Sequence, residues 1–432
     1  MKRQTESIEE FAKRPKLDTE ISAKILDTKS IPDHVWQKIF CSFTLEEIKL
    51  KVARVCRHFN IISNDCVQQI NICERLFESD YKYKMFDALS NFKFLRTIKI
   101  ERRIINHYNK EIDYFLMYAL KICPRLRFIQ ALHKLSIGFL DYIAKYGQNL
   151  YGLSLNFENN DKPEILYPLK NGMKDLKYLG IFSNLRNFKD EDLLSLVENS
   201  TELNSIKFVC DVSYDTILKI INSKKDKLKR LVFIQVVIAN ELLPNANELL
   251  QNAKNCPKLK NLWIAGMDIT KSGFEAISKM KNLKFLRLGF PKNTKIKTLK
   301  SKSDDLIKMM TNGKLENLKQ LTVNGIVDSI DALLMGVALS CPNLQILDCR
   351  FHNDNRKDFS KNIIRILVDN LPELKLLHLE WFNEMNDSNP PDIPLFIKSE
   401  LEEIVGNCEN KFQVTINEND KLIKISRISR EM

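Results

Sequence analysis

The chain has few of the residues that interrupt regular structure, with only 12 glycines and 13 prolines among 432 residues. Low-complexity and collagen-like structures need a much larger share of both residues, so the composition excludes them. The chain also lacks an uninterrupted apolar run of about 18 residues, the length that spans a bilayer. Its longest apolar run, residues 231–239, is broken by Gln235 and is typical of a buried strand. We therefore expect no membrane partner.

The motifs of catalytic and metal sites are absent as well. The 10 cysteines include no CxxC pair, and the 6 histidines form no HExxH or other metal-ligand spacing. Neither a Gly-rich phosphate loop nor a GxSxG elbow is found. We predict a binding protein and not an enzyme, with no catalytic residue, metal or cofactor. Scattered cysteines and a start without an apolar signal segment predict reduced thiols in a cytoplasmic or nuclear protein.

Charged residues are abundant, and the formal net charge of the chain is +12. A nucleic-acid partner would explain this excess, but a solvated, lysine-rich exterior explains it more often, and we favour the second interpretation. Residues 1–29 are polar, charged and without periodicity, which predicts a disordered basic tail. Within this tail Lys13, Arg14 and Lys16 form a short basic cluster. The cluster is either a nuclear import signal or a solvated charge patch.

Residues 30–70 have the apolar spacing of short helices. A first helix begins near Pro32, where a missing N–H costs little, and a capping box of Thr44 and Glu47 begins a second. A third follows and ends near Asp65. The apolar positions of these helices are Val35, Ile39, Phe40, Phe43, Ile48, Val52 and Val55. Three short helices cannot bury this much apolar surface among themselves, so we expect a partner to cover part of it.

Three features together resemble the F-box motif, and they follow one another in the order usual for that family. They are the dipeptide Ile31-Pro32, the helical stripe and the terminal cluster of residues 55–59. Phe59 stands where the family usually has Trp, and Ile31 where it has Leu. The resemblance implies a three-helix F-box that binds a Skp-type adaptor and, through it, a cullin. The residues that it implies for adaptor binding are Ile31, Pro32, Val35, Ile39, Phe40, Phe43, Ile48, Val55, Cys56 and Phe59.

The remaining sequence repeats one phrase, L-x-x-L-x-L, with aliphatic or aromatic substitutes. It begins at Leu95, Leu126, Leu150, Leu176, Leu203, Leu228, Leu259, Leu283, Leu318, Leu344 and Leu374. Alternation within the phrase predicts a strand, and residues 190–199 and 270–280 show the helical spacing that follows it. Repeats of this length are typical of leucine-rich-repeat proteins. The fold class is therefore α/β, a curved solenoid with parallel strands on the concave face and helices on the convex face.

Cys-Pro recurs immediately before the phrase, at Cys123, Cys256 and Cys341. We interpret each cysteine as a small buried residue at the end of a helix that the proline stops. This placement, together with the F-box-like block, resembles F-box/leucine-rich-repeat receptors. The predicted organisation is a tail over 1–29, an F-box over 30–70, a helical linker over 71–93 and a solenoid over 94–432. An atypical cap begins at about residue 383 and includes a strand with alternating Phe412, Val414 and Ile416.

The pleat predicts which side chains line the concave face. The second and third leucine positions of each phrase point inward, so the residues beside them point to the concave surface. Aromatic and arginine side chains there are typical of binding hot spots. The predicted substrate-binding residues are Tyr178, Phe182, Trp263, Phe285, Arg287, Arg350 and His378. Trp263 beside Arg287 suits an acidic or phosphorylated protein segment. The alternative is that a loop or the C-terminal tail covers some of these positions.

The resemblance implies a substrate-recognition subunit of an SCF-type ubiquitin ligase, which delivers a protein for ubiquitination and proteasomal degradation. Such a receptor makes no bonds itself and acts by holding its substrate near other subunits. Two alternatives remain open. One is a leucine-rich-repeat scaffold or inhibitor that recruits no ligase. The other is a basic nucleic-acid-associated protein, whose binding would be sensitive to salt.

Overall fold

The structure is a computed structural model. It describes Val35 and residues 67–72, 86–100, 109–133, 135–157, 164–183, 188–210, 212–234, 245–290, 296–326, 330–352, 360–382, 412–417 and 422–427. Among the residues predicted to form the F-box, Val35 and residues 67–70 lie within these ranges; Val35 is in a helix and half-buried, and residues 69 and 70 belong to a strand. The other predicted adaptor-binding residues, and the basic cluster at Lys13, Arg14 and Lys16, lie outside the described residues.

One 14-stranded sheet runs through the described part of the chain, with its strands in sequence order as far as β12. Neighbouring strands from β1 to β12 are parallel. These strands are β1 (Gln69–Ile72), β2 (Thr97–Ile100), β3 (Phe128–Ala131), β4 (Gly152–Phe157), β5 (Tyr178–Ser183), β6 (Ser205–Val209), β7 (Arg230–Ile234), β8 (Asn261–Ala265), β9 (Phe285–Gly289), β10 (Gln320–Ile326), β11 (Ile346–His352) and β12 (Leu376–Phe382). Each phrase predicted from the sequence leads into one strand, from β2 to β12.

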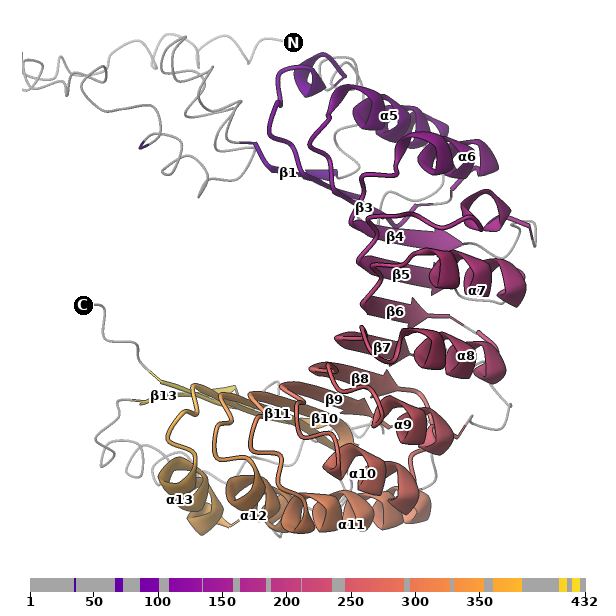
Figure 1. The fold of residues 1–432 in the computed structure, drawn as a ribbon. Helices are drawn as coiled ribbons and strands as arrows, with labels where there is room; N and C mark the ends of the chain where they lie inside the picture. The colour runs from indigo at the N-terminus through magenta and orange to yellow at the C-terminus, as the bar shows by residue number, and fades with distance from the viewer. Residues whose placement is uncertain are drawn as a thin grey trace, which may run out of the picture.

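Helices connect the strands and cover the outer side of the arc, while the strands line its inner side (Figure 1). They are α5 (Asn109–Ile122), α6 (Ile137–Tyr146), η5 (Tyr167–Leu169), α7 (Asp190–Asn199), α8 (Tyr214–Lys224), α9 (Asn247–Ala253), α10 (Lys271–Ser278), α11 (Ile296–Asn312), α12 (Ile330–Ser340) and α13 (Lys361–Asn370). The predicted α/β solenoid, with parallel strands on the concave face and helices on the convex face, is confirmed.

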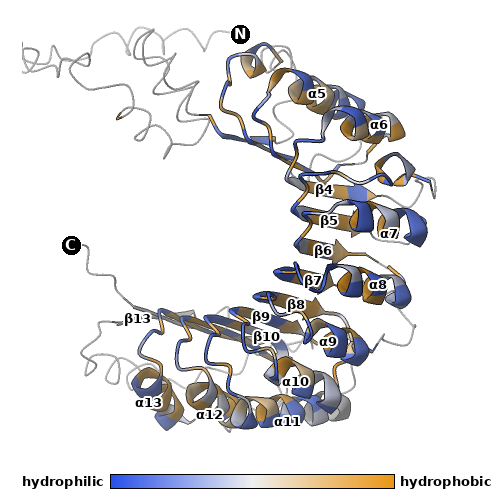
Figure 2. Cartoon of the chain, in the orientation of Figure 1, coloured by the Kyte–Doolittle hydropathy of each residue, from blue (hydrophilic) through white to orange (hydrophobic). Residues whose placement is uncertain are grey.

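The core lies between the sheet and the helices. In β8 the side chains alternate, so that Leu262 and Ile264 are buried while Asn261, Trp263 and Ala265 are half-buried. The same alternation recurs along the array, and apolar colour lies on the inward side of the helices in Figure 2. Complete burial of one leucine or isoleucine side chain contributes about 2 kcal/mol. The repeated phrase therefore stabilises the array unit by unit.

Backbone hydrogen bonds fix the spacing of the units just before each strand. The Lys260 N–H donates to the Lys229 carbonyl, and the Lys284 N–H donates to the Lys260 carbonyl, at 2.9 and 2.7 Å. The Lys319 N–H continues the series by donating to the Lys284 carbonyl at 2.8 Å. Side chains at equivalent positions of adjacent phrases thus lie beside each other on a rigid support.

The cysteines of the Cys-Pro pairs are buried, as the sequence predicts. Burial raises the pKa of the Cys123 and Cys256 thiols to about 11 and that of Cys341 to about 12. A thiol with such a pKa remains protonated near neutral pH, and the thiolate is the form that reacts. These three cysteines are therefore packing residues.

The two ends of the sheet differ from the repeated phrase. At the N-terminal end β1 begins the sheet one strand before the first predicted phrase. At the C-terminal end β13 (Phe412–Asn417) and β14 (Leu422–Arg427) form an antiparallel pair, and β14 pairs antiparallel with β12. The strand predicted at Phe412, Val414 and Ile416 is confirmed, whereas β14 was not predicted.

Candidate functional site

Strand register arranges the concave side chains in rows across the sheet. Trp263 on β8 pairs with Val232 on β7 on one side and with Arg287 on β9 on the other. The same row continues from Val232 to Lys207 on β6. Predicted residues Trp263 and Arg287 are therefore neighbours, as expected from equivalent positions in consecutive phrases.

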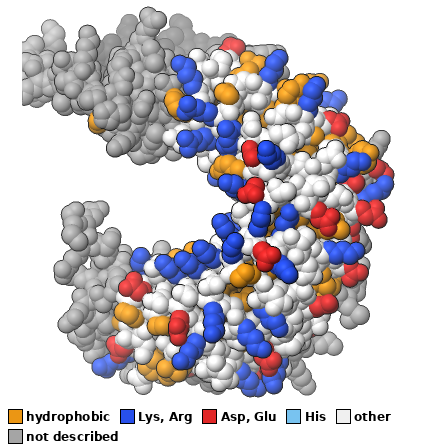
Figure 3. Space-filling model, in the orientation of Figure 1, with side chains coloured by type: hydrophobic (Ala, Val, Ile, Leu, Met, Phe, Trp, Pro, Cys, Tyr) orange, Lys and Arg blue, Asp and Glu red, His pale blue; other side chains and the backbone are white. Residues whose placement is uncertain are grey.

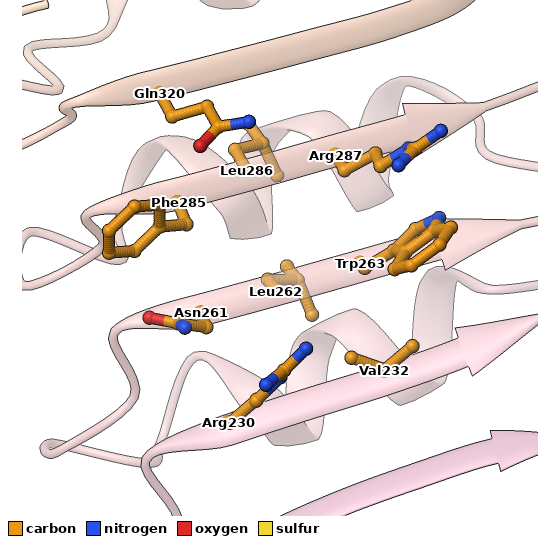
Figure 4. A pocket seen from close by; sticks show the side chains of 9 residues that line it. All are labelled: Arg230, Val232, Asn261, Leu262, Trp263, Phe285, Leu286, Arg287 and Gln320. Carbon is orange, nitrogen blue, oxygen red and sulfur yellow. The ribbon is translucent and has the colours of Figure 1, made fainter. Parts of the chain in front are cut away.

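A hollow of about 230 Å³ opens around this pair on the concave face. We name it the cationic pocket, and its lining comes from strands β7 to β10 (Figure 4). The lining residues are Arg230, Val232, Asn261, Leu262, Trp263, Phe285, Leu286, Arg287 and Gln320. Phe285 is 40% exposed, which is unusual for so large an apolar side chain. The predicted residues Trp263, Phe285 and Arg287 thus share one hollow.

Cations in this pocket lie against aromatic rings. The Arg287 guanidinium carbon lies 4.2 Å from the centroid of the Trp263 ring, and the Lys207 Nζ lies 5.7 Å from the same ring. Stacking of this kind holds the guanidinium plane in one orientation while its N–H edges stay available. The Arg287 Nε is buried and has no hydrogen-bond partner among the residues that the structure describes.

Positive charges crowd this region. Burial lowers the pKa of Lys207, and the charges of Arg230 and Arg287 lower it further. Burial also lowers the pKa of Arg287, although Asp348 acts in the opposite direction. Like charges so close together disfavour one another until an anion neutralises them. The pocket is therefore suited to a negatively charged ligand.

The edge of the concave face is basic too. Lysine or arginine occupies most of the positions immediately before the strands, and Figure 3 shows these types gathered along the inner side of the arc. These residues are Arg96, Arg127, Lys177, Lys229, Lys260, Lys284, Lys319 and Lys375. Such a row attracts an acidic ligand over a distance and raises its association rate.

Arg350 and His378, both predicted as substrate-binding, lie further along the concave face. His378 Nδ1 lies 2.7 Å from Asp348 Oδ1, on adjacent strands. Arg350 Nε lies 3.2 Å from Glu380 Oε2 and 3.7 Å from Asp348 Oδ1. We call Asp348, Arg350, His378 and Glu380 the paired cluster. Arg350 and His378 already have carboxylate partners, so the paired cluster does not resemble the cationic pocket.

The other two predicted residues, Tyr178 and Phe182, lie on β5, on the opposite side of the pocket from the paired cluster. Lys207 connects them to the pocket, because its Nζ lies 4.7 Å from the centroid of the Phe182 ring. Lys207 and Arg230 were not among the predicted substrate-binding residues. The pleat does place Lys207 on the concave face, between Ile206 and Phe208, and it would have placed Arg230 there too, because Arg230 precedes Leu231 in its phrase.

Within the described ranges no helix is long and apolar enough to cross a membrane. No group of three or more His, Cys, Asp or Glu side chains that could hold a metal ion occurs among those residues.

No family model matches the chain. No curated protein matches it either. Among solved structures, the yeast Rad7 and Elc1 complex has a chain with 13% identity and a TM-score of 0.42, over 90% of this chain and 96% of that one. An internalin from Listeria monocytogenes has 15% identity and a TM-score of 0.34, over 79% and 86% of the two chains. The leucine-rich-repeat protein LegL7 from Legionella pneumophila has 11% identity and a TM-score of 0.35, over 70% and 91%. These scores are low, so the fold assignment rests on the strand order and register described above.

Proposed function

We propose that this protein is the substrate receptor of an SCF-type ubiquitin ligase, and that its solenoid binds an acidic or phosphorylated protein segment. The observation that supports the binding of such a segment is the cationic pocket. There Arg230 and Arg287 line the hollow with Trp263, and Lys207 lies against the Trp263 ring beside it. Burial and the charges of both arginines lower the pKa of Lys207. An anionic segment would relieve this repulsion and hydrogen-bond to the Arg287 fork.

The ligase half of the proposal rests on the F-box-like residues Ile31 to Phe59. Residues 31–59 would bind a Skp-type adaptor through their apolar stripe, and the adaptor would bring a cullin. The receptor would then act by proximity, because a substrate held on the concave face meets a ubiquitin-charged enzyme at high effective concentration. Entry into the nucleus through Lys13, Arg14 and Lys16 stays a prediction.

Co-purification tests the ligase half. Ile39→Ala and Phe40→Ala should each remove roughly 2 kcal/mol of packing from the adaptor interface if they lie at its centre. We expect adaptor and cullin to be lost from the purified complex while the thermal unfolding midpoint of the solenoid is unchanged. Lys38→Ala, next to the stripe in sequence, is the matched control and should retain both partners.

A wild-type chain that retains no adaptor under any condition would contradict the receptor proposal. The scaffold or inhibitor alternative, in which the concave face binds a protein without recruiting a ligase, would then replace it.

A further inference from the structure

A second group of aromatic side chains lies on the concave face, on the N-terminal side of the cationic pocket. The Phe128 ring lies 5.6 Å from the Tyr178 ring and 6.2 Å from the Tyr151 ring, centroid to centroid. Phe182 is half-buried beside them on β5. We call Phe128, Tyr151, Tyr178 and Phe182 the aromatic platform. Tyr151 is 42% exposed, so the platform presents ring surface to a ligand.

Two glycines leave room for the rings of the platform. A Cβ atom at Gly152 would meet Phe128 Cδ2 at 2.2 Å, so the Phe128 ring lies directly over that glycine. A Cβ atom at Gly180 would meet the Tyr178 hydroxyl at 3.0 Å and Phe182 Cε2 at 3.2 Å. The Phe128 ring is tilted by 35° to the Tyr178 ring and by 50° to the Tyr151 ring. Together these rings form an aromatic surface against which a planar or apolar side chain packs.

The distance between platform and pocket follows from the sheet. The platform is centred on β4 and the pocket on β8, and the strands between them follow in order. Hydrogen-bonded strands lie about 4.8 Å apart, so the two centres are about 19 Å apart along the sheet. A segment that crosses the strands in extended conformation covers this distance in about six residues at ~3.3 Å each. Ser205 and Lys207 on β6 lie along the way.

We infer that the concave face binds a bipartite protein segment, whose phosphorylated residue enters the cationic pocket and whose aromatic residue, about six positions away, stacks on the aromatic platform. The inference rests on the proposed function and specifies its ligand. Lys207 belongs to both subsites, because its Nζ faces the Phe182 ring and the Trp263 ring.

A phosphate group fits the pocket better than a single carboxylate. The charges of Arg230 and Arg287 both act on Lys207 there. A phosphomonoester carries a charge of about −1.5 to −2 at pH 7 and three strong acceptor oxygens, so it balances more of that charge.

Stacking surface and positive charge together also suit single-stranded nucleic acid. The charges of the paired cluster, further along the concave face, favour a peptide instead. Asp348 and Glu380 on β11 and β12 pair with Arg350, so no excess of positive charge is left there for a phosphate backbone that continued past the pocket.

Fluorescence anisotropy with labelled peptides tests the inference on the full chain. Each peptide is built from Gly and Ser and carries one phosphoserine and one phenylalanine, separated by one, five or nine residues, in either order. We expect the strongest binding at five intervening residues, about tenfold tighter than for the same peptide without phenylalanine, because ring stacking contributes about 1.4 kcal/mol. Tyr178→Ala should remove this gain and leave the affinity of the phosphoserine-only peptide unchanged.

Tyr146→Ala is the matched control, since Tyr146 is an exposed tyrosine on the convex helix α6 and lies outside the platform. Equal affinity at every spacing, or an unaltered gain in Tyr178→Ala, would overturn the bipartite ligand and leave the proposed function standing. Affinities that do not depend on phosphoserine in any peptide would overturn the pocket assignment as well. A labelled oligothymidylate that binds more tightly than every peptide would identify nucleic acid as the ligand instead.

Discussion

The cationic pocket and the paired cluster lie on the same concave face and differ in how their charges are compensated. In the paired cluster His378 lies 2.7 Å from Asp348 and Arg350 lies 3.2 Å from Glu380. In the pocket Arg287 stacks on Trp263, and its Nε has no hydrogen-bond partner among the described residues. Both regions come from equivalent positions of the same repeated phrase. Side-chain identity alone therefore separates a surface whose Arg and His side chains lie beside carboxylates from one whose cations lie against aromatic rings.

This difference has an energetic cost that only a ligand can offset. A paired charge on a half-buried surface contributes to stability, modestly. Burial and, after it, the charges of Arg230 and Arg287 lower the pKa of Lys207, so its charged form destabilises the free protein. Charges that cost stability are typical of functional sites. The pocket is accordingly the better candidate for substrate binding, and the paired cluster is the better candidate for a structural role.

The largest expected effect comes from reversing a charge in the pocket. Arg287→Glu replaces a stacked cation with an anion that repels the ligand, and we expect about 100-fold weaker binding of the phosphoserine peptide. Trp263→Ala removes the ring that orients Arg287 and should weaken binding by about tenfold. Anisotropy gives both affinities.

Thermal unfolding supplies the control for these two variants. The side chains of Arg287 and Trp263 are only half-buried, so the unfolding midpoints should stay near that of the wild type. A large drop in the midpoint of Trp263→Ala would show instead that Trp263 belongs to the core, and the site would then lie elsewhere.

Lys207→Met separates binding from stability. The pKa of Lys207 is lowered, so its charged form costs stability at every pH below the lowered value. Methionine keeps the apolar length and removes the charge, so we expect a higher unfolding midpoint together with about tenfold weaker phosphopeptide binding. In the wild type the affinity should fall as pH rises through the lowered pKa of Lys207. A lower midpoint in Lys207→Met would contradict this account of the pocket.

The smallest effect on binding is expected in the paired cluster. Asp348→Ala leaves His378 without its carboxylate partner and should lower the free energy of unfolding by about 1 kcal/mol. Phosphopeptide affinity should change by less than about threefold, because Asp348 acts on Arg287 only through space. Urea denaturation and anisotropy measure the two quantities. A loss of binding as large as that of Arg287→Glu would move the paired cluster into the site.

The repeated phrase made the fold predictable, and with it the concave position of the pocket residues. Alternation placed Trp263, Phe285 and Arg287 on the concave face, and equal phrase lengths put consecutive phrases in register. Pairing across strands could have been predicted in the same way, because Arg350 and Glu380 stand at equivalent positions of consecutive phrases. Arg350 was instead grouped with Trp263 on residue type alone, although the carboxylates of Glu380 and Asp348 are its partners.

Sequence patterns were least informative where the repeat ends and where side chains approach a glycine closely. The phrase describes parallel units, so it did not predict that β14 turns back antiparallel beside β12. Nor did it predict the aromatic platform, which depends on Gly152 and Gly180 leaving room for rings from neighbouring positions. Glycine within a strand indicates close approach, but not which side chain approaches.

The most direct test of the central claim is the affinity of the wild-type chain for one peptide in two forms. The peptide has five residues between serine and phenylalanine, and its serine is phosphorylated in one form and free in the other. Anisotropy titrations of both forms are repeated at increasing salt. We predict at least about tenfold preference for the phosphorylated form, shrinking as salt screens the pocket. Equal affinity for the two forms at low salt would contradict the claim that the cationic pocket awaits an anion.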